Sequence, residues 1–168
     1  MPDIFGVTGW KNSGKTTLVA ALVREFKHRS WTVNTVKHAS DWFQIDREGT
    51  DSHAHRTAGA HEVAIVSDTK WALIAETRKG GETMSLQGMI SRLGSCDIVL
   101  VEGYKSEPHP KIECVGDSSE TPLWRTNKSI VAVANDSDDE DCPLPQFRRD
   151  DVAGIADYIA QMTGLGLT

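Results

Sequence analysis

The 168-residue sequence has little of what marks exported, membrane or nucleic-acid-binding proteins. Its three cysteines are widely spaced and form no C-x-x-C pair, which excludes a disulfide framework or zinc ribbon and favours free thiols in a reducing compartment. The aliphatic runs are only strand-sized, and the N-terminus lacks a charged and apolar leader pattern, so we expect a soluble cytoplasmic protein without membrane contact. A net charge of −6 provides no basic excess, which argues against general binding to a nucleic-acid backbone, so we expect no nucleic-acid partner.

A glycine loop near the N-terminus is the feature around which the sequence is organised. The stretch 9–16, G-W-K-N-S-G-K-T, matches G-x-x-x-x-G-K-[ST] at every fixed position. An apolar run at 4–8 precedes it and a helical pattern at 16–26 follows, which is the strand–loop–helix order of a phosphate-binding P-loop. The alternative is an ordinary glycine-rich turn with a hydroxyl that caps the helix, but such a turn would need neither the lysine nor both glycines. The predicted ligand-binding residues of this loop are Gly9, Asn12, Ser13, Gly14, Lys15, Thr16 and Thr17.

The residue types in this loop suit a nucleoside triphosphate with Mg²⁺. Backbone N–H groups can approach the phosphates closely only where no side chain intervenes, hence the two glycines. Lys15 can reach the β- and γ-phosphates, and the hydroxyl of Thr16 can ligate the metal.

Two later runs predict strands that end beside this loop. The alternating run 31–36 delivers Lys37 and His38 at its carboxyl end, which is the edge where open α/β sheets bind ligands. The aliphatic run 98–101 predicts a strand buried on both faces that ends in Glu102, a residue able to hold the Mg²⁺ shell or the attacking water. The alternative is a surface carboxylate paired with Lys105.

The remaining pattern predicts an α/β fold of the P-loop NTPase class. The runs 62–66 and 71–76 predict an antiparallel hairpin, added to the sheet as an edge element or forming a dimer surface. Asp97 lies at the far end of the buried strand and is interpreted as structural, whereas Asn135 and Asp136 leave a strand at the binding edge. We expect one domain, 1–168, with a three-layer sandwich and a mostly parallel sheet.

Several short motifs occur in one order along the chain: the P-loop, V-K-H at 36–38, D-x-x-G-x-D-S at 46–52 and V-E-G-Y-K at 101–105. With these motifs the sequence resembles the molybdopterin-guanine dinucleotide biosynthesis protein B family, over nearly the whole chain. The resemblance implies a homodimeric GTP-binding protein with weak Mg²⁺-dependent GTPase activity. It also implies a partner enzyme that attaches GMP to molybdopterin, with molybdopterin as a further candidate ligand.

Carried onto this sequence, the resemblance implies that Lys37, Asp46, Asp51 and Glu102 surround the metal and the γ-phosphate. The catalytic candidates are then Asp46, Asp51 and Glu102, and the metal ligands are Thr16 and Glu102. Relatives in the wider class that reach across a dimer use a lysine at the position of Trp10, so no such lysine is expected here.

Recognition of the base cannot rest on the standard N-K-x-D motif, because the stretch 127–130 lacks its aspartate. The prediction of a guanine nucleotide therefore rests on the resemblance and on Asn135 and Asp136.

Two other classes of protein function stay open. A P-loop small-molecule kinase needs lid arginines, for which Arg47 and Arg56 are available, and a metallochaperone-type GTPase needs a cluster of soft ligands that the scattered cysteines do not supply.

Overall fold

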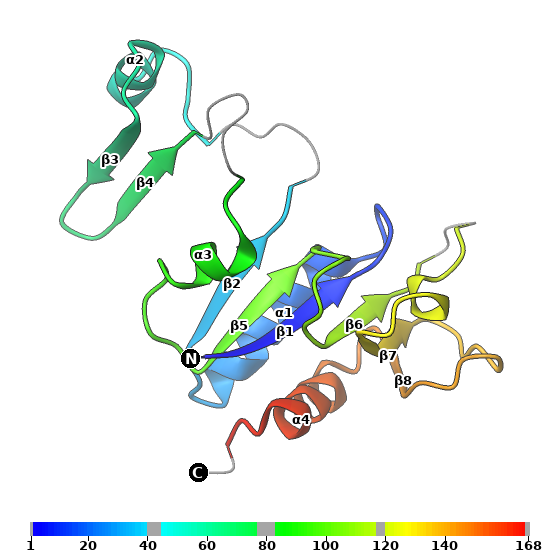
Figure 1. Ribbon diagram of the computed structural model, residues 1–168. Helices are drawn as coiled ribbons and strands as arrows, with labels where there is room; N and C mark the ends of the chain where they lie inside the picture. Colours follow the sequence, from blue (N-terminus) through cyan, green and yellow to red (C-terminus); the bar gives the residue numbers. More distant parts are fainter. Residues whose placement is uncertain (1, 40–44, 77–82, 117–119, 167–168) are drawn as a thin grey trace. The chain divides into compact units, whose positions relative to one another are not determined.

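The computed structural model describes residues 2–39, 45–76, 83–116 and 120–166 (Figure 1). The helices and strands follow one another as β1 (Asp3–Thr8), α1 (Lys15–His28), β2 (Val33–Lys37), α2 (Asp51–Thr57), β3 (Glu62–Val66), β4 (Trp71–Ala75), α3 (Leu86–Ile90), β5 (Ile98–Glu102), β6 (Lys111–Cys114), the 3₁₀ turn η1 (Leu123–Arg125), β7 (Ile130–Asn135), β8 (Gln146–Arg148) and α4 (Val152–Thr163). Within the described ranges no helix combines the length and the apolar character needed to cross a membrane.

The chain forms two compact units. The first, which we call the sheet unit, comprises Met1–His38 and Met89–Thr168, and the second, the hairpin unit, comprises Ala39–Gly88. The expectation of a single domain concerns the chain as a whole and stays a prediction.

The sheet unit is built on a six-stranded sheet with the order β2-β5-β1-β6-β7-β8 (Figure 1). All neighbouring strands are parallel, so all six carboxyl ends lie at one edge. Helices α1 and α4 pack against each other and against β1. The mostly parallel sheet is therefore confirmed. The three-residue strand β8 is an addition that the sequence pattern did not predict.

The core of the sheet unit follows directly from the sequence pattern. The four aliphatic residues of β5, at 98–101, are fully buried, as expected of a strand covered on both faces. In α1 the spacing of Leu18, Leu22 and Phe26 places all three on one stripe, and they are buried together with Ile155 and Ile159 of α4. Each large apolar side chain buried in this way contributes about 1.5–3 kcal/mol, which fixes the strands that carry the site.

Asp97 lies at the opposite edge of the sheet from the glycine loop, as predicted. Its carboxylate accepts hydrogen bonds from the backbone N–H and the hydroxyl of Thr32, both at 2.6 Å. The hydroxyl bond, followed by the backbone bond, lowers the pKa of Asp97. Asp97 therefore ties the start of β5 to the start of β2, which confirms its structural role.

The hairpin unit contains the predicted antiparallel pair, with Val63 opposite Ile74 and Ile65 opposite Ala72. Strands β3 and β4 form a two-stranded sheet of their own and are not joined to the six-stranded sheet. Helix α2 starts at Asp51, and the Thr50 side chain caps its first turn by accepting from His53 N.

The apolar residues Leu86, Met89, Ile90 and Leu93 have the i, i+3, i+4, i+7 spacing of a helix that reaches Leu93, but helix α3 ends at Ile90. Beyond it the backbone continues in tighter turns, with Arg92 N bonded to Met89 O and Leu93 N to Ile90 O.

Candidate functional site

The glycine loop joins β1 to α1 at the carboxyl edge of the sheet, and two glycines shape its backbone. Gly9 has φ +141° and Gly14 has φ +91°, where side chains are rarely tolerated. A Cβ atom on Gly9 would lie 2.4 Å from the carbonyl oxygen of Cys114 and 2.6 Å from Ser13 Oγ. No side chain fits there, so the motif requires glycine for steric reasons.

Helix α1 begins directly after Gly14, which has no side chain to cap the first turn. The first hydrogen bond into the helix runs from Leu18 N to Gly14 O at 3.0 Å. The N–H groups at positions 15–17 therefore have no carbonyl partner in the helix. Together with the positive end of the helix dipole, they form an anion site that needs no rearrangement.

Lys15 is the first residue of α1, and its ammonium group donates to the carbonyl oxygen of Trp10 across the loop. The same carbonyl accepts from Ser13 N at 3.3 Å. Burial lowers the pKa of Lys15, while the charges of Cys114 and Glu102 act in the opposite direction. The lysine is thus held by one carbonyl group that a phosphate oxygen could replace.

Thr16, Lys37 and Glu102 come together from three elements of the sheet unit. Thr16 Oγ1 donates to Glu102 Oε1 at 2.8 Å, and Lys37 Nζ lies 3.0 Å from that carboxylate oxygen. Lys37 Nζ also donates to Thr16 Oγ1 at 3.3 Å. Lys37 and Glu102 are paired in the register of β2 and β5, so the sheet sets them side by side. Glu102 therefore contacts these two residues rather than Lys105.

The donor atoms at this edge fit Mg²⁺. A hydroxyl and a carboxylate are hard oxygen ligands, and in phosphoryl-transfer sites Mg²⁺ takes only one or two protein ligands while phosphates and waters complete its shell. Glu102 is 7% exposed, so its charge is poorly solvated and favours a cation nearby. In the part of the chain that the structure describes, no three His, Cys, Asp or Glu side chains are grouped for a metal.

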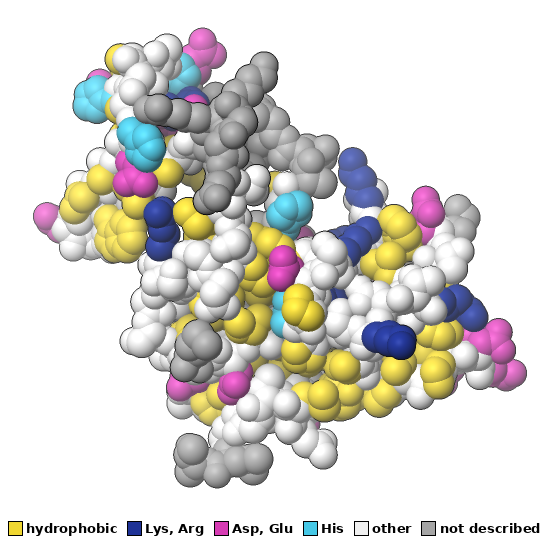
Figure 2. Space-filling model, viewed as in Figure 1, with side chains coloured by type: hydrophobic (Ala, Val, Ile, Leu, Met, Phe, Trp, Pro, Cys, Tyr) yellow, Lys and Arg dark blue, Asp and Glu magenta, His cyan; other side chains and the backbone are white. Residues whose placement is uncertain are grey.

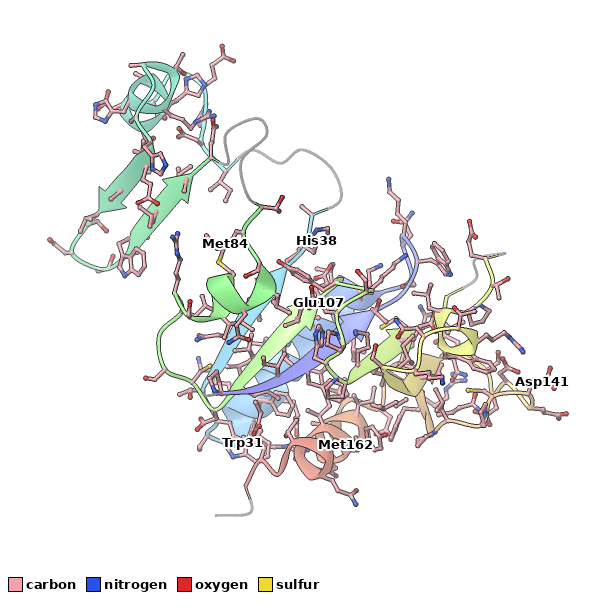
Figure 3. All side chains as sticks on the ribbon, viewed as in Figure 1. Trp31, His38, Met84, Glu107, Asp141 and Met162 are labelled. Carbon is pink, nitrogen blue, oxygen red and sulfur yellow. The ribbon has the colours of Figure 1, made fainter. Side chains whose placement is uncertain are left out.

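The turn after β5 is built from two consecutive left-handed residues, Gly103 with φ +89° and Tyr104 with φ +45°. A non-glycine residue in this region costs of order 1–3 kcal/mol, which the surroundings must offset. The imidazole of His38 lies 4.8 Å from the ring of Tyr104, and His38 N donates to Glu102 O at 3.0 Å. His38, at the carboxyl end of β2 (Figure 3), thus supports the turn beside Glu102, and its role as a ligand contact stays a prediction.

Trp10 and Lys105 form a contact that sequence reasoning missed. Lys105 Nζ lies 3.8 Å from the centroid of the Trp10 ring, a cation–π geometry. The indole N–H donates to the carbonyl oxygen of Thr121 at 2.9 Å. The residue that replaces the lysine of the wider class therefore anchors the glycine loop to a neighbouring loop and holds a cation beside it.

A pocket of about 380 Å³ opens beside the glycine loop. Its walls are the carboxyl ends of β6 and β7, Trp124 and the acidic loop at 136–140. Gly116, which lines it, lies so close to the loop that a Cβ atom there would be 3.1 Å from Ser13 Cα. The pocket and the anion site are therefore neighbours on one edge, and Figure 3 marks Asp141 just beyond the acidic wall.

Asn135 lines this pocket and carries an acceptor without a partner. Its side chain is 4% exposed, and within the described residues its Oδ1 atom has no hydrogen-bond partner. Its Nδ2 donates to Gln146 Oε1 at 2.8 Å. Gln146 is itself oriented by the backbone of Asp139, accepting from its N–H at 2.8 Å and donating to its carbonyl at 2.9 Å. This arrangement fixes which atom of the Asn135 amide stays free.

Trp124 is held against the pocket by Glu113, a fully buried residue that the sequence pattern did not single out. The two oxygens of Glu113 accept from Leu123 N and Trp124 N, both at 2.8 Å. Burial raises the pKa of Glu113, and these two backbone bonds oppose that rise. The carboxyl group therefore fixes η1 and the aromatic wall that it carries.

Asp136 does not stand alone at this edge, because Arg149 binds it. Arg149 Nε donates to Asp136 Oδ1 at 2.8 Å, and the second guanidinium nitrogen faces Oδ2. The third, Nη1, donates to the carbonyl oxygen of Ser13 in the glycine loop at 3.2 Å. Sequence analysis missed Arg149 because it follows β8, a strand too short to leave a pattern.

Asp46 and Asp51 belong to the hairpin unit. Asp46 accepts from Ser52 Oγ at 2.7 Å, from Thr50 Oγ1 at 3.1 Å and from Arg47 N at 3.1 Å. The Ser52 bond is the main cause that lowers the pKa of Asp46. Asp51 is the first residue of α2 and is exposed. In this unit Asp46 organises the start of α2, and the metal and γ-phosphate roles of both residues stay predictions.

Comparison with known proteins agrees with this architecture. The profile of the family described as "Molybdopterin guanine dinucleotide synthesis protein B" matches residues 4–136. The molybdopterin-guanine dinucleotide biosynthesis adapter protein of Haemophilus influenzae is 36% identical over 93% of this chain and 86% of its own length. The corresponding protein of Escherichia coli is 31% identical over 96% of this chain and 93% of its own length.

A solved structure described as molybdopterin-guanine biosynthesis protein B has the same fold. It superposes with a TM-score of 0.74 at 28% identity and covers 95% of this chain and 99% of its own. Fold, motif order and sequence likeness agree along nearly the whole length, and the chain therefore belongs to the molybdopterin guanine dinucleotide synthesis protein B family, MobB.

Proposed function

We propose that this protein binds GTP with Mg²⁺ and assists a partner enzyme that attaches GMP to molybdopterin. The observation that carries the nucleotide part is the meeting of an uncapped helix N-terminus, Lys15 and the Thr16–Glu102 pair at one sheet edge. The pathway part rests on the relatives, which are named adapter proteins of molybdopterin-guanine dinucleotide biosynthesis. An adapter acts through a second protein, so we infer a partner that performs the GMP transfer.

The proposed roles of the site residues follow from their charges and positions. Lys15 and the N–H groups at 15–17 hold the phosphates, and Lys37 adds a second ammonium group beside them. Mg²⁺, when held by Thr16 and Glu102, would neutralise charge on the phosphate oxygens. Glu102 would also orient water next to the phosphates. We propose that the resulting GTPase activity is weak and that the protein is accessory to a nucleotidyltransferase.

The pocket beside the glycine loop supports guanine as the base. Guanine presents an imino and an amino N–H on one edge, whereas adenine presents only an amino group there. The free Oδ1 of Asn135 and the carboxylates at 136–140 are acceptors and so complement the guanine edge. Trp124 offers an aromatic wall on which a flat base can stack.

We also propose a homodimer that is formed through the hairpin unit. Large apolar side chains of β3 and β4 are exposed, among them Val66 and Trp71 at 76% and 73%, and apolar groups gather on this hairpin in Figure 2. A two-stranded hairpin is marginal by itself, and unpaired strand edges favour pairing with a second copy. Covering this face would stabilise the hairpin.

The proposal also includes a second ligand and a cellular location. Molybdopterin is a candidate second ligand only through the family. A cytoplasmic location agrees with the state of Cys96, Cys114 and Cys142, which are all free.

The two alternative functions are less well supported. Family membership favours neither a small-molecule kinase nor a metallochaperone. Arg56 is one of the two arginines available for a kinase lid, and it is bound to Glu76 and Asp46 within the hairpin unit.

The test is calorimetric titration of the purified protein with GTP, GDP and ATP in the presence and absence of Mg²⁺. We expect Mg²⁺-dependent binding of GTP that is tighter than that of ATP, and loss of GTP binding in Lys15→Ala with an unchanged melting temperature. Lys11→Ala, an exposed lysine of the same loop, is the matched control. Equal GTP affinity in Lys15→Ala and wild type would show that the loop is not the site.

A further inference from the structure

Arg149 is a side chain with two attachments on different parts of the site. Its guanidinium group binds Asp136 through two nitrogens and the Ser13 carbonyl of the glycine loop through the third. Its backbone is also fixed, because Arg149 N donates to Asn135 O at 3.1 Å. The planar fork of arginine suits such a bridge, since each nitrogen donates in a set direction.

The bridge reaches the glycine loop at a point where space is scarce. Arg149 Nη1 lies 3.3 Å from the position that a Cβ atom would take on Gly14, and 3.8 Å from that on Gly116. Gly14, which directly precedes the helix, therefore also leaves room for this guanidinium. The side chain of Arg149 is 29% exposed and that of Asp136 is 53% exposed, so water screens the charge of this pair and its two bonds act mainly by fixing the orientation of the carboxylate.

Asp136 lines the base pocket, and Ser13 lies in the phosphate loop. Since Arg149 touches the phosphate loop through a backbone carbonyl, its bond there leaves the loop N–H groups free for phosphate. Anything that orders the loop also orders Arg149 and, through it, Asp136. The reverse holds by linkage, because a coupling free energy between two sites acts equally in both directions.

We propose that Arg149 is a positioning residue that couples the phosphate loop to the base pocket. Resting on the proposed function, the inference is that the protein recognises a nucleoside triphosphate as one unit, with base and phosphates each improving the binding of the other. Arg149 acts through Asp136 and Ser13 and does not contact the phosphates. Loss of Arg149 therefore weakens binding of ligands that carry a base and spares inorganic polyphosphate.

The experiment compares GTP with inorganic tripolyphosphate, both with Mg²⁺, by calorimetry. In Arg149→Met and in Asp136→Ala we expect GTP affinity to fall about tenfold, and tripolyphosphate affinity to stay within about twofold of wild type. The double variant should be no weaker than either single variant, since both remove the same link. Arg149→Lys, which keeps the charge but not the fork, should recover only part of the loss.

Arg148→Met is the matched control, because it removes the same charge from an exposed neighbouring side chain. An equal loss of tripolyphosphate affinity in Arg149→Met would overturn the coupling and make Arg149 a phosphate contact or a support of the loop. Additive losses in the double variant would also overturn it. If wild type binds GTP but Arg149→Met behaves like Arg148→Met, the inference fails while the proposed function stands. Wild-type protein that binds no GTP would refute both.

Should Arg149→Met fail to fold, Arg149→Gln probes the same link. It keeps a polar side chain but removes the charge and the fork that bind Asp136. The same selective loss, for GTP and not for tripolyphosphate, is expected, and an equal loss of both ligands would contradict the proposal.

Discussion

Strand β5 of the sheet unit and strand β4 of the hairpin unit have the same length and nearly the same aliphatic character, but they differ in what covers them. All five residues of β5 are buried, whereas β4 contains no buried residue. The sheet unit can therefore hold Glu102 and the glycine loop in place with its own core. The hairpin unit buries Val63 but leaves Ile65, Val66, Trp71 and Leu73 exposed, which is the basis of the proposed dimer. Apolar sequence marks a strand in both cases, and only the covering layers distinguish the two roles.

The largest expected effect sharpens this comparison with one substitution in each strand. Leu100→Ala in β5 removes a fully buried side chain and should lower the free energy of unfolding by about 2–5 kcal/mol. Leu73→Ala in β4, where the side chain is 46% exposed, should change it by about 0.5 kcal/mol or less. Urea denaturation of dilute protein measures both. Equal losses would show that the hairpin is packed into the same core.

The next effect tests where the chemistry lies. Glu102→Gln keeps the size of the side chain and removes the charge, so single-turnover GTP hydrolysis with Mg²⁺ should fall about 10²–10³-fold while GTP binding survives. Asp46→Asn is the counterpart in the hairpin unit. If Asp46 only organises α2, hydrolysis stays near the wild-type rate, and a comparable fall would assign it the catalytic role predicted from the resemblance.

A smaller effect concerns self-association. Trp71→Glu places a charge on the exposed face of the hairpin and should weaken the proposed dimer by about tenfold or more, seen as a shift toward monomer in light scattering. Met162→Glu is the control, because Met162 is exposed on α4 of the sheet unit. Wild-type protein that stays monomeric at tens of micromolar, an order-of-magnitude range for weak association, would refute the proposed dimer.

The smallest effect is the acid sensitivity of the two units. Asp97 in the sheet unit and Asp46 in the hairpin unit both have a lowered pKa, caused first by Thr32 and Ser52 respectively. A carboxyl whose folded pKa lies below its unfolded pKa stabilises the fold above the unfolded value and loses that contribution as the pH falls through the folded value. The cost of Asp97→Asn, measured by urea midpoints, should therefore be present at neutral pH and fade below about pH 4.

The counterpart Asp46→Asn should act locally. We expect faster hydrogen exchange of the first turn of α2 at neutral pH, with little change in the urea midpoint of the whole chain, and the difference from wild type should again fade in acid. A lower urea midpoint of the whole chain in Asp46→Asn would instead show that the two units unfold as one cooperative body.

The sequence by itself determined the features that depend on near neighbours along the chain. The spacing of glycine, lysine and threonine at 9–16 defines the glycine loop, because steric limits on φ and the reach of short side chains are local. The period of α1 and the aliphatic run of β5 predicted their buried faces for the same reason. The sequence was also enough to predict Glu102 as a site residue, because parallel strands bring their carboxyl ends to a common edge.

Only the tertiary structure decided which distant groups complete the site. Arg149 meets the Ser13 carbonyl across 136 positions of sequence, and Glu113 holds Trp124 against the pocket through a loop that has no period. The hairpin was predicted, yet its separation from the six-stranded sheet depends on strand pairing, which composition does not encode. Such contacts follow from the path of the whole chain, since a single hydrogen-bonded side chain leaves no repeating pattern in the sequence around it.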